Sequence, residues 1–239
     1  MKVLGIETAT MMIGVAILDE RGLVAEYRIE ATRSRSERLM PMIDRVLKDS
    51  DCTPQDLGGI AISIGPGSFT GLRIGVSTAK GLAFGLGLPV VGVSTLEVLA
   101  TSAAVGMRGY SICPMLDAKR QEVYAALFRA SAEGGLERIT EEEAITPARL
   151  LEKVVALHDP TLFLGNGALL YEGELSVRLG DQAIFVSRID PYPSPAIVAE
   201  LGMKRLLNGE NEVSSLIPVY LSRYEPKIKL DRRASLKQN

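Results

Sequence analysis

The sequence G-P-G-S-F-T-G-L-R-I-G, at residues 65–75, decides the fold of this chain. It follows an apolar run at residues 59–64, which predicts a buried strand. A Gly-Pro-Gly break ends that strand, and the hydroxyl of Ser68 or Thr70 can cap a helix that follows. We therefore expect a strand, a turn and then a helix over about residues 68–86.

The expected helix carries a row of small residues at four-residue spacing: Gly71, Gly75, Ala79 and Ala83. Glycine inside a helix costs about 0.5–1 kcal/mol relative to alanine, so the row needs a compensating contact. Residues four apart share a helix face, and a face without bulky side chains lets another element approach closely. Spacing alone favours packing against the protein's own sheet, and it leaves contact with a second protein as the alternative.

Two nucleotide-binding motifs are excluded in this stretch. A P-loop needs a lysine after its last glycine, and none stands at that place. The dinucleotide fingerprint needs G-x-G-x-x-G, but Thr70 stands where the third glycine belongs and Gly71 comes one residue later. Neither type of phosphate-binding loop is therefore present here.

Composition is typical of a globular protein with one large domain or two small ones. The chain has 239 residues, of which 46% are hydrophobic and 23% charged. Its net charge of −2 gives no reason to expect nucleic-acid binding by the surface as a whole. No apolar run reaches the ~18 residues of a membrane span, and Glu7 interrupts the apolar N-terminus too early for a signal peptide. We expect a cytoplasmic protein that does not contact a membrane.

Cysteine and histidine are too few for a metal centre or a hydrolase. Cys52 and Cys113 form no C-x-x-C pair, and His158 is the only histidine. A metallopeptidase needs two histidines at H-x-x-x-H spacing, and a serine hydrolase needs G-x-S-x-G, so both are excluded. Only the C-terminal end is locally basic, and we expect it to be solvated. Its basic residues are Lys227, Lys229, Arg232, Arg233 and Lys237.

The order of expected elements repeats in a weak internal duplication. Three strands with tight turns precede alternating helices and strands up to about residue 104, and a similar but shorter series begins near residue 111. One strand of the second series is expected over residues 136–144. This arrangement matches the α/β, two-lobed, ribonuclease H-like fold of the actin and sugar-kinase superfamily, with a reduced second lobe. We expect lobes at residues 1–106 and 107–239, with a helix at residues 196–207 that packs back on the first lobe.

Three motifs closely resemble the TsaB family, formerly called YeaZ, over nearly the whole chain. They are G-P-G-S-F-T-G-L-R-I-G at residues 65–75, L-G-I-E-T-A-T at residues 4–10, and D-A-K-R-Q-E-V-Y at residues 117–124. The resemblance implies a non-catalytic subunit that pairs with TsaD and acts with the ATPase TsaE. Together they install threonylcarbamoyl on the adenosine next to the tRNA anticodon. It also implies that TsaD holds the metal, and that this chain needs no cofactor and meets tRNA only through the complex.

The resemblance places the TsaD interface on the helices at about residues 36–50 and 68–86. It therefore favours contact with a second protein, and it implies that the isolated chain self-associates through the same face. On this basis Gly75→Arg should block TsaD binding and leave the fold intact. The expected interface residues are Leu39, Met42, Ile43, Val46, Gly71, Leu72, Gly75, Val76 and Ala79.

Active proteins of the two-lobed fold hold hydrated magnesium and a nucleotide between the lobes, with a carboxylate in the first loop. The corresponding positions here are Glu7, Thr8, Asp117, Gly165 and Gly167. The family usually has Asp in place of the first of these residues, and often His in place of Arg35. We expect no catalytic residue and no metal ligand, and we expect the loops to be remnants that could still bind a nucleotide weakly. The alternative is an ATPase or small-molecule kinase of this superfamily that acts on its own.

Overall fold

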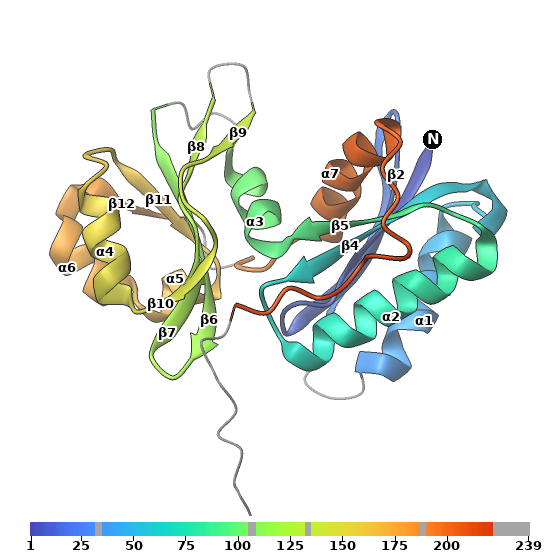
Figure 1. Ribbon diagram of the computed structural model, residues 1–239, viewed down its shortest axis with the longest axis horizontal. Helices are drawn as coiled ribbons and strands as arrows, with labels where there is room; N and C mark the ends of the chain where they lie inside the picture. The colour runs from blue at the N-terminus through green and yellow to red at the C-terminus, as the bar shows by residue number, and fades with distance from the viewer. Residues whose placement is uncertain (32–34, 105–108, 132–134, 187–189, 222–239) are drawn as a thin grey trace, which may run out of the picture.

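The computed structural model describes residues 1–31, 35–104, 109–131, 135–186 and 190–221. Two β-sheets lie side by side, and helices flank each of them (Figure 1). The predicted lobe boundary near residue 106 and the basic C-terminal end both lie outside the described residues. The boundary therefore stays a prediction.

The first sheet has the strand order β3-β2-β1-β4-β5. Strands β1 to β3 form an antiparallel meander, and β4 and β5 run parallel to β1. The five strands are β1 (Lys2–Glu7), β2 (Met12–Asp19), β3 (Gly22–Glu30), β4 (Leu57–Gly65) and β5 (Val90–Ser94). Because β4 is covered by helices on both faces, its sequence is a nearly continuous apolar run rather than an alternating one.

Helices cover both faces of the first sheet. Helices α1 (Arg35–Asp49) and α2 (Phe69–Leu86) bury one face in a common core, and α7 (Pro195–Leu207) buries the other face (Figure 1). Helix α7 approaches closely because Gly202 leaves room: a Cβ there would overlap the side chain of Ala61 on β4. Among the described residues, no helix is long and apolar enough to cross a membrane.

The second sheet is smaller and has the order β10-β7-β6-β11-β12, with β8 and β9 joined to one side of β6. Its strands are β6 (Ser111–Lys119), β7 (Glu122–Ala125), β8 (Phe128–Ala130), β9 (Leu136–Arg138), β10 (Glu143–Ile145), β11 (Thr161–Leu164) and β12 (Ala183–Phe185). Helix α3 (Thr95–Ala104) packs on β6. The other helices around this sheet are α4 (Pro147–Val155), α5 (Asn166–Leu170) and α6 (Glu172–Leu179).

The prediction of a single strand over residues 136–144 is wrong. The chain instead forms β9, which pairs with β8, and β10, which pairs with β7. Between them, the amides of Ile139 and Thr140 both donate to the carbonyl of Leu127. The hydroxyl of Thr140 accepts from the Leu127 amide at 2.9 Å. These bonds satisfy the backbone where the chain crosses from one partner strand to the next.

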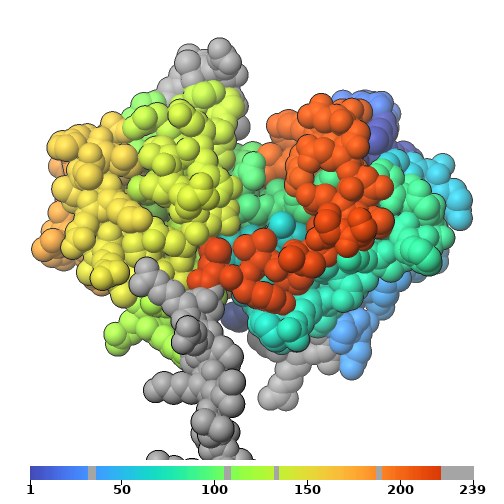
Figure 2. Space-filling model, in the orientation of Figure 1, coloured from blue at the N-terminus to red at the C-terminus, as the bar shows by residue number. Residues whose placement is uncertain are grey.

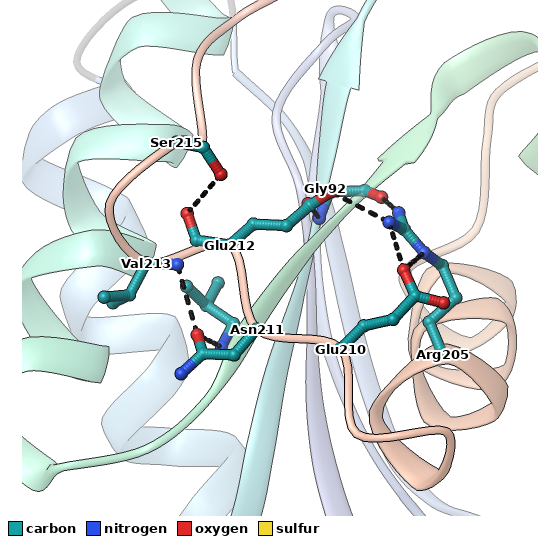
Figure 3. A network of polar contacts seen from close by, with 8 residues as sticks. Gly92, Arg205, Glu210, Asn211, Glu212, Val213 and Ser215 are labelled. Carbon is teal, nitrogen blue, oxygen red and sulfur yellow. Dashed lines mark hydrogen bonds and ion pairs between the residues drawn. The ribbon is translucent and has the colours of Figure 1, made fainter.

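After α7, residues 210–221 form an extended segment, here called the C-terminal strap, that lies along the first lobe and reaches the second (Figures 1 and 2). Arg205 anchors its start: the guanidinium binds Glu210, Glu212 and the carbonyl of Gly92 on β5 (Figure 3). The Glu212 carboxylate also accepts from the Gly92 amide at 2.7 Å. Further along, Leu216 is buried in the core under α1 and α2. The strap is therefore an integral layer of the first lobe.

Candidate functional site

Helix α2 begins and ends as its sequence predicts. The Ser68 hydroxyl accepts from the amide of Gly71 at 3.3 Å, which caps the first turn. Gly87 ends the helix in the left-handed conformation, with φ at 68°. The expected helix over residues 68–86 is confirmed to within one residue.

The nine residues expected to contact a partner are buried inside the first lobe of the chain by itself, and their role in an interface stays a prediction. On α1, all four apolar residues point toward the sheet, and on α2 all five point the same way. The nine are Leu39, Met42, Ile43, Val46, Gly71, Leu72, Gly75, Val76 and Ala79. The physical reason is amphipathic packing: the apolar face of each helix covers the sheet, and its opposite face is exposed.

Gly75 shows why the row of small residues is needed. A Cβ at this position would overlap the hydroxyl of Thr8 and lie 2.9 Å from Cδ1 of Ile62 on β4. Thr8 itself is fully buried at the end of β1. The row therefore lets α2 pack closely on the protein's own sheet, which is the interpretation that spacing alone favoured.

A second row of small residues lies on the exposed side of α2: Ser77, Gly81 and Gly85. A Cβ at Gly81 or Gly85 would meet no atom within 4 Å. Beside this row, Phe84 is 88% exposed, and Met40 on the neighbouring α1 is 47% exposed. These three residues are also four positions apart, so the sequence spacing could have identified this second row as well. We call the exposed faces of α1 and α2, centred on Met40, Gly81 and Phe84, the outer helix face.

A cavity of about 360 Å³ lies between the lobes. Of the five candidate nucleotide-binding residues, only Asp117 lines this cavity. Its lining consists of Ala9, Thr10, Met11, Gly67, Ser68, Phe69, Leu116, Asp117, Ala118, Lys119, Tyr124 and Asn166. Residues from both lobes thus meet here, but most of the candidate nucleotide residues do not.

Glu7 is enclosed by the protein instead of facing the cavity. Its carboxylate accepts from the hydroxyl of Ser63 on β4 and from the Ala9 amide at 2.5 Å, and it has no exposed surface. Burial raises the pKa of this carboxyl to about 7, although both hydrogen bonds and the charge of Arg28 oppose the shift. Glu7 and Thr8 therefore both lie in the protein interior, and the expected nucleotide-binding role of this loop stays a prediction.

Gly165 and Gly167 lie close against the backbone of β6. Gly165 has φ at 96°, and a Cβ there would overlap the carbonyl of Met115 on β6. A Cβ at Gly167 would lie 2.9 Å from the carbonyl carbons of Met115 and Leu116. These glycines allow the start of α5 to lie directly on β6, and their expected role beside a nucleotide stays a prediction.

Asp117 is engaged with its own hairpin. Its carboxylate accepts from the Lys119 amide at 2.8 Å and pairs with the Lys119 ammonium at 2.5 Å. Its own amide donates to Asn166 at 3.2 Å. Among the described residues, no group of three or more His, Cys, Asp or Glu side chains is placed to hold a metal ion.

Comparison with known proteins gives the family. The family model described as "TsaD: tRNA N6-adenosine threonylcarbamoyltransferase" matches residues 24–228. The TsaB protein of Bacillus subtilis is 35% identical over 231 residues, which cover 96% of this chain and 97% of that relative. The chain belongs to the TsaB family. Escherichia coli TsaB is 32% identical over 70% of this chain and 72% of its own. Both relatives are named tRNA threonylcarbamoyladenosine biosynthesis proteins.

Solved structures confirm the expected fold class for this member of the TsaB family. YeaZ from Pseudomonas aeruginosa superposes with a TM-score of 0.75 at 25% identity, covering 92% of this chain and 99% of that one. A ROK hexokinase from Thermus thermophilus superposes with a TM-score of 0.52 at 12% identity, covering 87% of this chain and 100% of that one. The second likeness shows that the two-lobed α/β fold is shared with sugar kinases, and it shows the fold alone.

Proposed function

We propose that this chain is a cytoplasmic accessory subunit of tRNA threonylcarbamoyladenosine synthesis that binds TsaD through the outer helix face. The observation that carries the proposal is the bare backbone at Gly81 and Gly85 beside the exposed Phe84. A row without side chains lets a partner helix come within the ~8–10 Å of close packing, and large exposed apolar side chains are typical of interaction sites. TsaE joins the assembly, and this chain meets tRNA only through the assembled complex.

The geometry between the lobes supports a role without catalysis. The first-loop carboxylate, Glu7, is held inside the protein by Ser63 and Ala9, so it cannot reach a ligand in the cavity. The second carboxylate, Asp117, is paired with Lys119. An ATPase or kinase acting on its own would need these carboxylates to face a metal-bound phosphate. The proposal therefore requires no cofactor of this chain.

We expect Asp117→Asn to leave threonylcarbamoylation by the assembled proteins within about twofold of the wild-type rate. The side chain makes a local ion pair with an exposed lysine, and such pairs contribute about 0–1 kcal/mol. The measurement is incorporation of labelled threonine into tRNA by TsaD, TsaE and this chain. A loss of activity with TsaD binding preserved would favour a working nucleotide site.

We expect Gly81→Arg to weaken TsaD binding about 100-fold or more while the chain stays folded. The new side chain has open space in the isolated chain, but in a close helix contact it would place an unpaired charge in the interface. Pull-down and calorimetric titration with TsaD measure the loss, and circular dichroism checks the fold. Light scattering should show that self-association weakens too, because both processes use the outer helix face.

The matched control is Val177→Arg, which places the same charge at an 86% exposed position on α6 of the second lobe. It should bind TsaD as tightly as the wild type. If Gly81→Arg binds TsaD with undiminished affinity, the interface lies elsewhere on the molecule.

A further inference from the structure

The C-terminal strap wraps the free edge of the first sheet. Strand β5 is the last strand of that sheet, and β4 is its neighbour on the inner side. Alternate residues of a strand direct their backbone groups to opposite sides, and the carbonyl of Pro89 accepts from the Ile60 amide of β4 at 3.0 Å. The backbone groups of Val90 and Gly92 therefore point to the free edge. An uncovered edge of this kind is a template for pairing with another chain.

The strap and Arg205 satisfy the amide and the carbonyl of both residues. The Val90 amide donates to the side-chain oxygen of Asn211 at 3.3 Å, and the Val90 carbonyl accepts from the Glu212 amide at 2.8 Å. The Gly92 amide donates to the Glu212 carboxylate at 2.7 Å, and the Gly92 carbonyl accepts from Arg205 (Figure 3). These groups thus take the place that one more strand would have on this edge.

Beyond β5, the strap is held by apolar packing. Leu216 is buried in the core beneath α1 and α2, whereas α7, from which the strap starts, covers the opposite face of the sheet. A Cβ on Gly92 would lie 2.9 Å from Cδ1 of Leu216, so the strap packs closely on β5 as it crosses from one face to the other. Removal of the strap would expose the apolar slot of Leu216 together with the edge of β5. A chain whose slot is empty is therefore unfavourable, and the slot needs an occupant.

A single turn joins the strap to α7. The Glu210 amide donates to the carbonyl of Arg205 at 3.2 Å, and Gly209 within this turn has φ at 82°. This is the Schellman arrangement, in which a glycine takes the left-handed conformation at the end of a helix. The strap binds groups of the first lobe that precede this turn in the sequence. A change of conformation at the turn would therefore carry the strap away from its own lobe and leave its binding groups unaltered.

We infer that the strap exchanges between two copies of this chain, so that the strap of one copy covers β5 of the other. The second copy offers the same Asn211, Glu212 and Leu216 to the same partners, so the closed and exchanged forms differ mainly in the conformation at Gly209. Exchange of an identical element between copies is a low-cost route to a dimer. The inference goes beyond the proposed function, in which self-association uses the outer helix face. The exchanged dimer is held by β5 and the strap.

The test mixes two full-length chains, one carrying Phe69→Cys and the other Tyr220→Cys. In the closed chain the rings of Phe69 and Tyr220 have centroids 5.0 Å apart and are about half exposed, so a short bismaleimide can join cysteines at these positions. The native Cys52 and Cys113 are both buried. After incubation at high protein concentration, the mixture should give a cross-linked dimer on a denaturing gel, because the strap of one chain lies on the first lobe of the other. A chain with both substitutions is the control for the reach of the reagent and should cross-link within itself.

Gly209→Ala in both chains should raise the yield of cross-linked dimer about 10-fold or more. An L side chain is strained in the left-handed region, and extension of the turn releases this strain in both copies. The matched control is Gly87→Ala at the end of α2, where φ is 68° and the Leu88 amide donates to the Ala83 carbonyl in the same kind of turn. At neither glycine would a Cβ meet an atom within 4 Å, and only Gly209 leads into the strap. The control should leave the yield unchanged, and circular dichroism checks the fold of both variants.

The same mixture is tested with Gly81→Arg added to both chains, which separates strap exchange from association through the outer helix face. The cross-linked dimer should persist there. The inference is overturned if that dimer is lost with Gly81→Arg, or if the mixture gives none while the doubly substituted chain cross-links within itself. It is also overturned if Gly209→Ala and Gly87→Ala raise the yield equally. The mixture that keeps Gly209 decides the question even if Gly209→Ala does not fold. None of these measurements involves TsaD, so they are independent of the test of the proposed function.

Discussion

Replacing Gly75 by arginine is expected to abolish folding, and replacing it by alanine should lower the free energy of unfolding by about 1–3 kcal/mol. The added Cβ would overlap the hydroxyl of Thr8 and crowd Ile62, and both neighbours are fully buried. Neither can move without disturbing the contact between α2 and the sheet. Urea unfolding followed by circular dichroism measures the change for the alanine variant, and soluble yield reports on the arginine variant.

The matched controls are Gly81→Ala and Gly85→Ala on the exposed side of the same helix. Each should raise the free energy of unfolding by about 0.5–1 kcal/mol, because alanine has the higher helix propensity and its Cβ meets no atom. If replacement by alanine lowers the free energy of unfolding at position 75 and raises it at position 81, the two rows face different surroundings. If Gly75→Ala were as stable as the wild type, and Gly75→Arg folded but failed to bind TsaD, the inner row would be the docking surface after all.

The second large effect is a loss of stability as pH rises, which we assign to the buried Glu7. The pKa of its carboxyl is about 7 in the folded chain, whereas the ordinary pKa of a glutamate side chain is 4.5. Between these two pH values the folded state binds more protons than the unfolded state. The contribution of Glu7 to the free energy of unfolding therefore falls as pH rises. It is fully present below about pH 4.5 and is lost as pH passes through 7. From the two pKa values, the loss amounts to about 3 kcal/mol.

Glu7→Gln should remove most of this slope. The amide oxygen can still accept from the Ala9 amide, and the amide nitrogen can donate to the Ser63 hydroxyl, so the neutral side chain fits the same contacts. At pH 8 the variant should be more stable than the wild type, and at pH 5 the two should differ by less than about 1 kcal/mol. Urea unfolding at pH 5, 6, 7 and 8 tests this. Glu141→Gln, at an exposed position, is the control and should keep the wild-type slope. An unchanged slope in Glu7→Gln would mean that another group titrates.

The sequence by itself determined the local structure around residues 57–87 and the family. An apolar run before Gly-Pro-Gly predicted β4, and the Ser68 hydroxyl and Gly87 predicted the two ends of α2. These features depend on a few neighbouring residues, so they can be read without knowing the rest of the fold. The repeated order of strands and helices similarly predicted the two-lobed α/β architecture that solved structures share.

Only the tertiary structure decided which side of α2 faces the sheet. Four-residue spacing shows that residues share a face, but the rows beginning at Gly71 and at Ser77 both have it, and both consist of small residues. Likewise, the motif at Glu7 placed a carboxylate at the end of β1, whereas its direction depends on Ser63, a residue 56 positions away on β4. Which neighbour fills the space beside a glycine, or meets a carboxylate, is set by long-range packing. A pattern of local spacing carries no information about it.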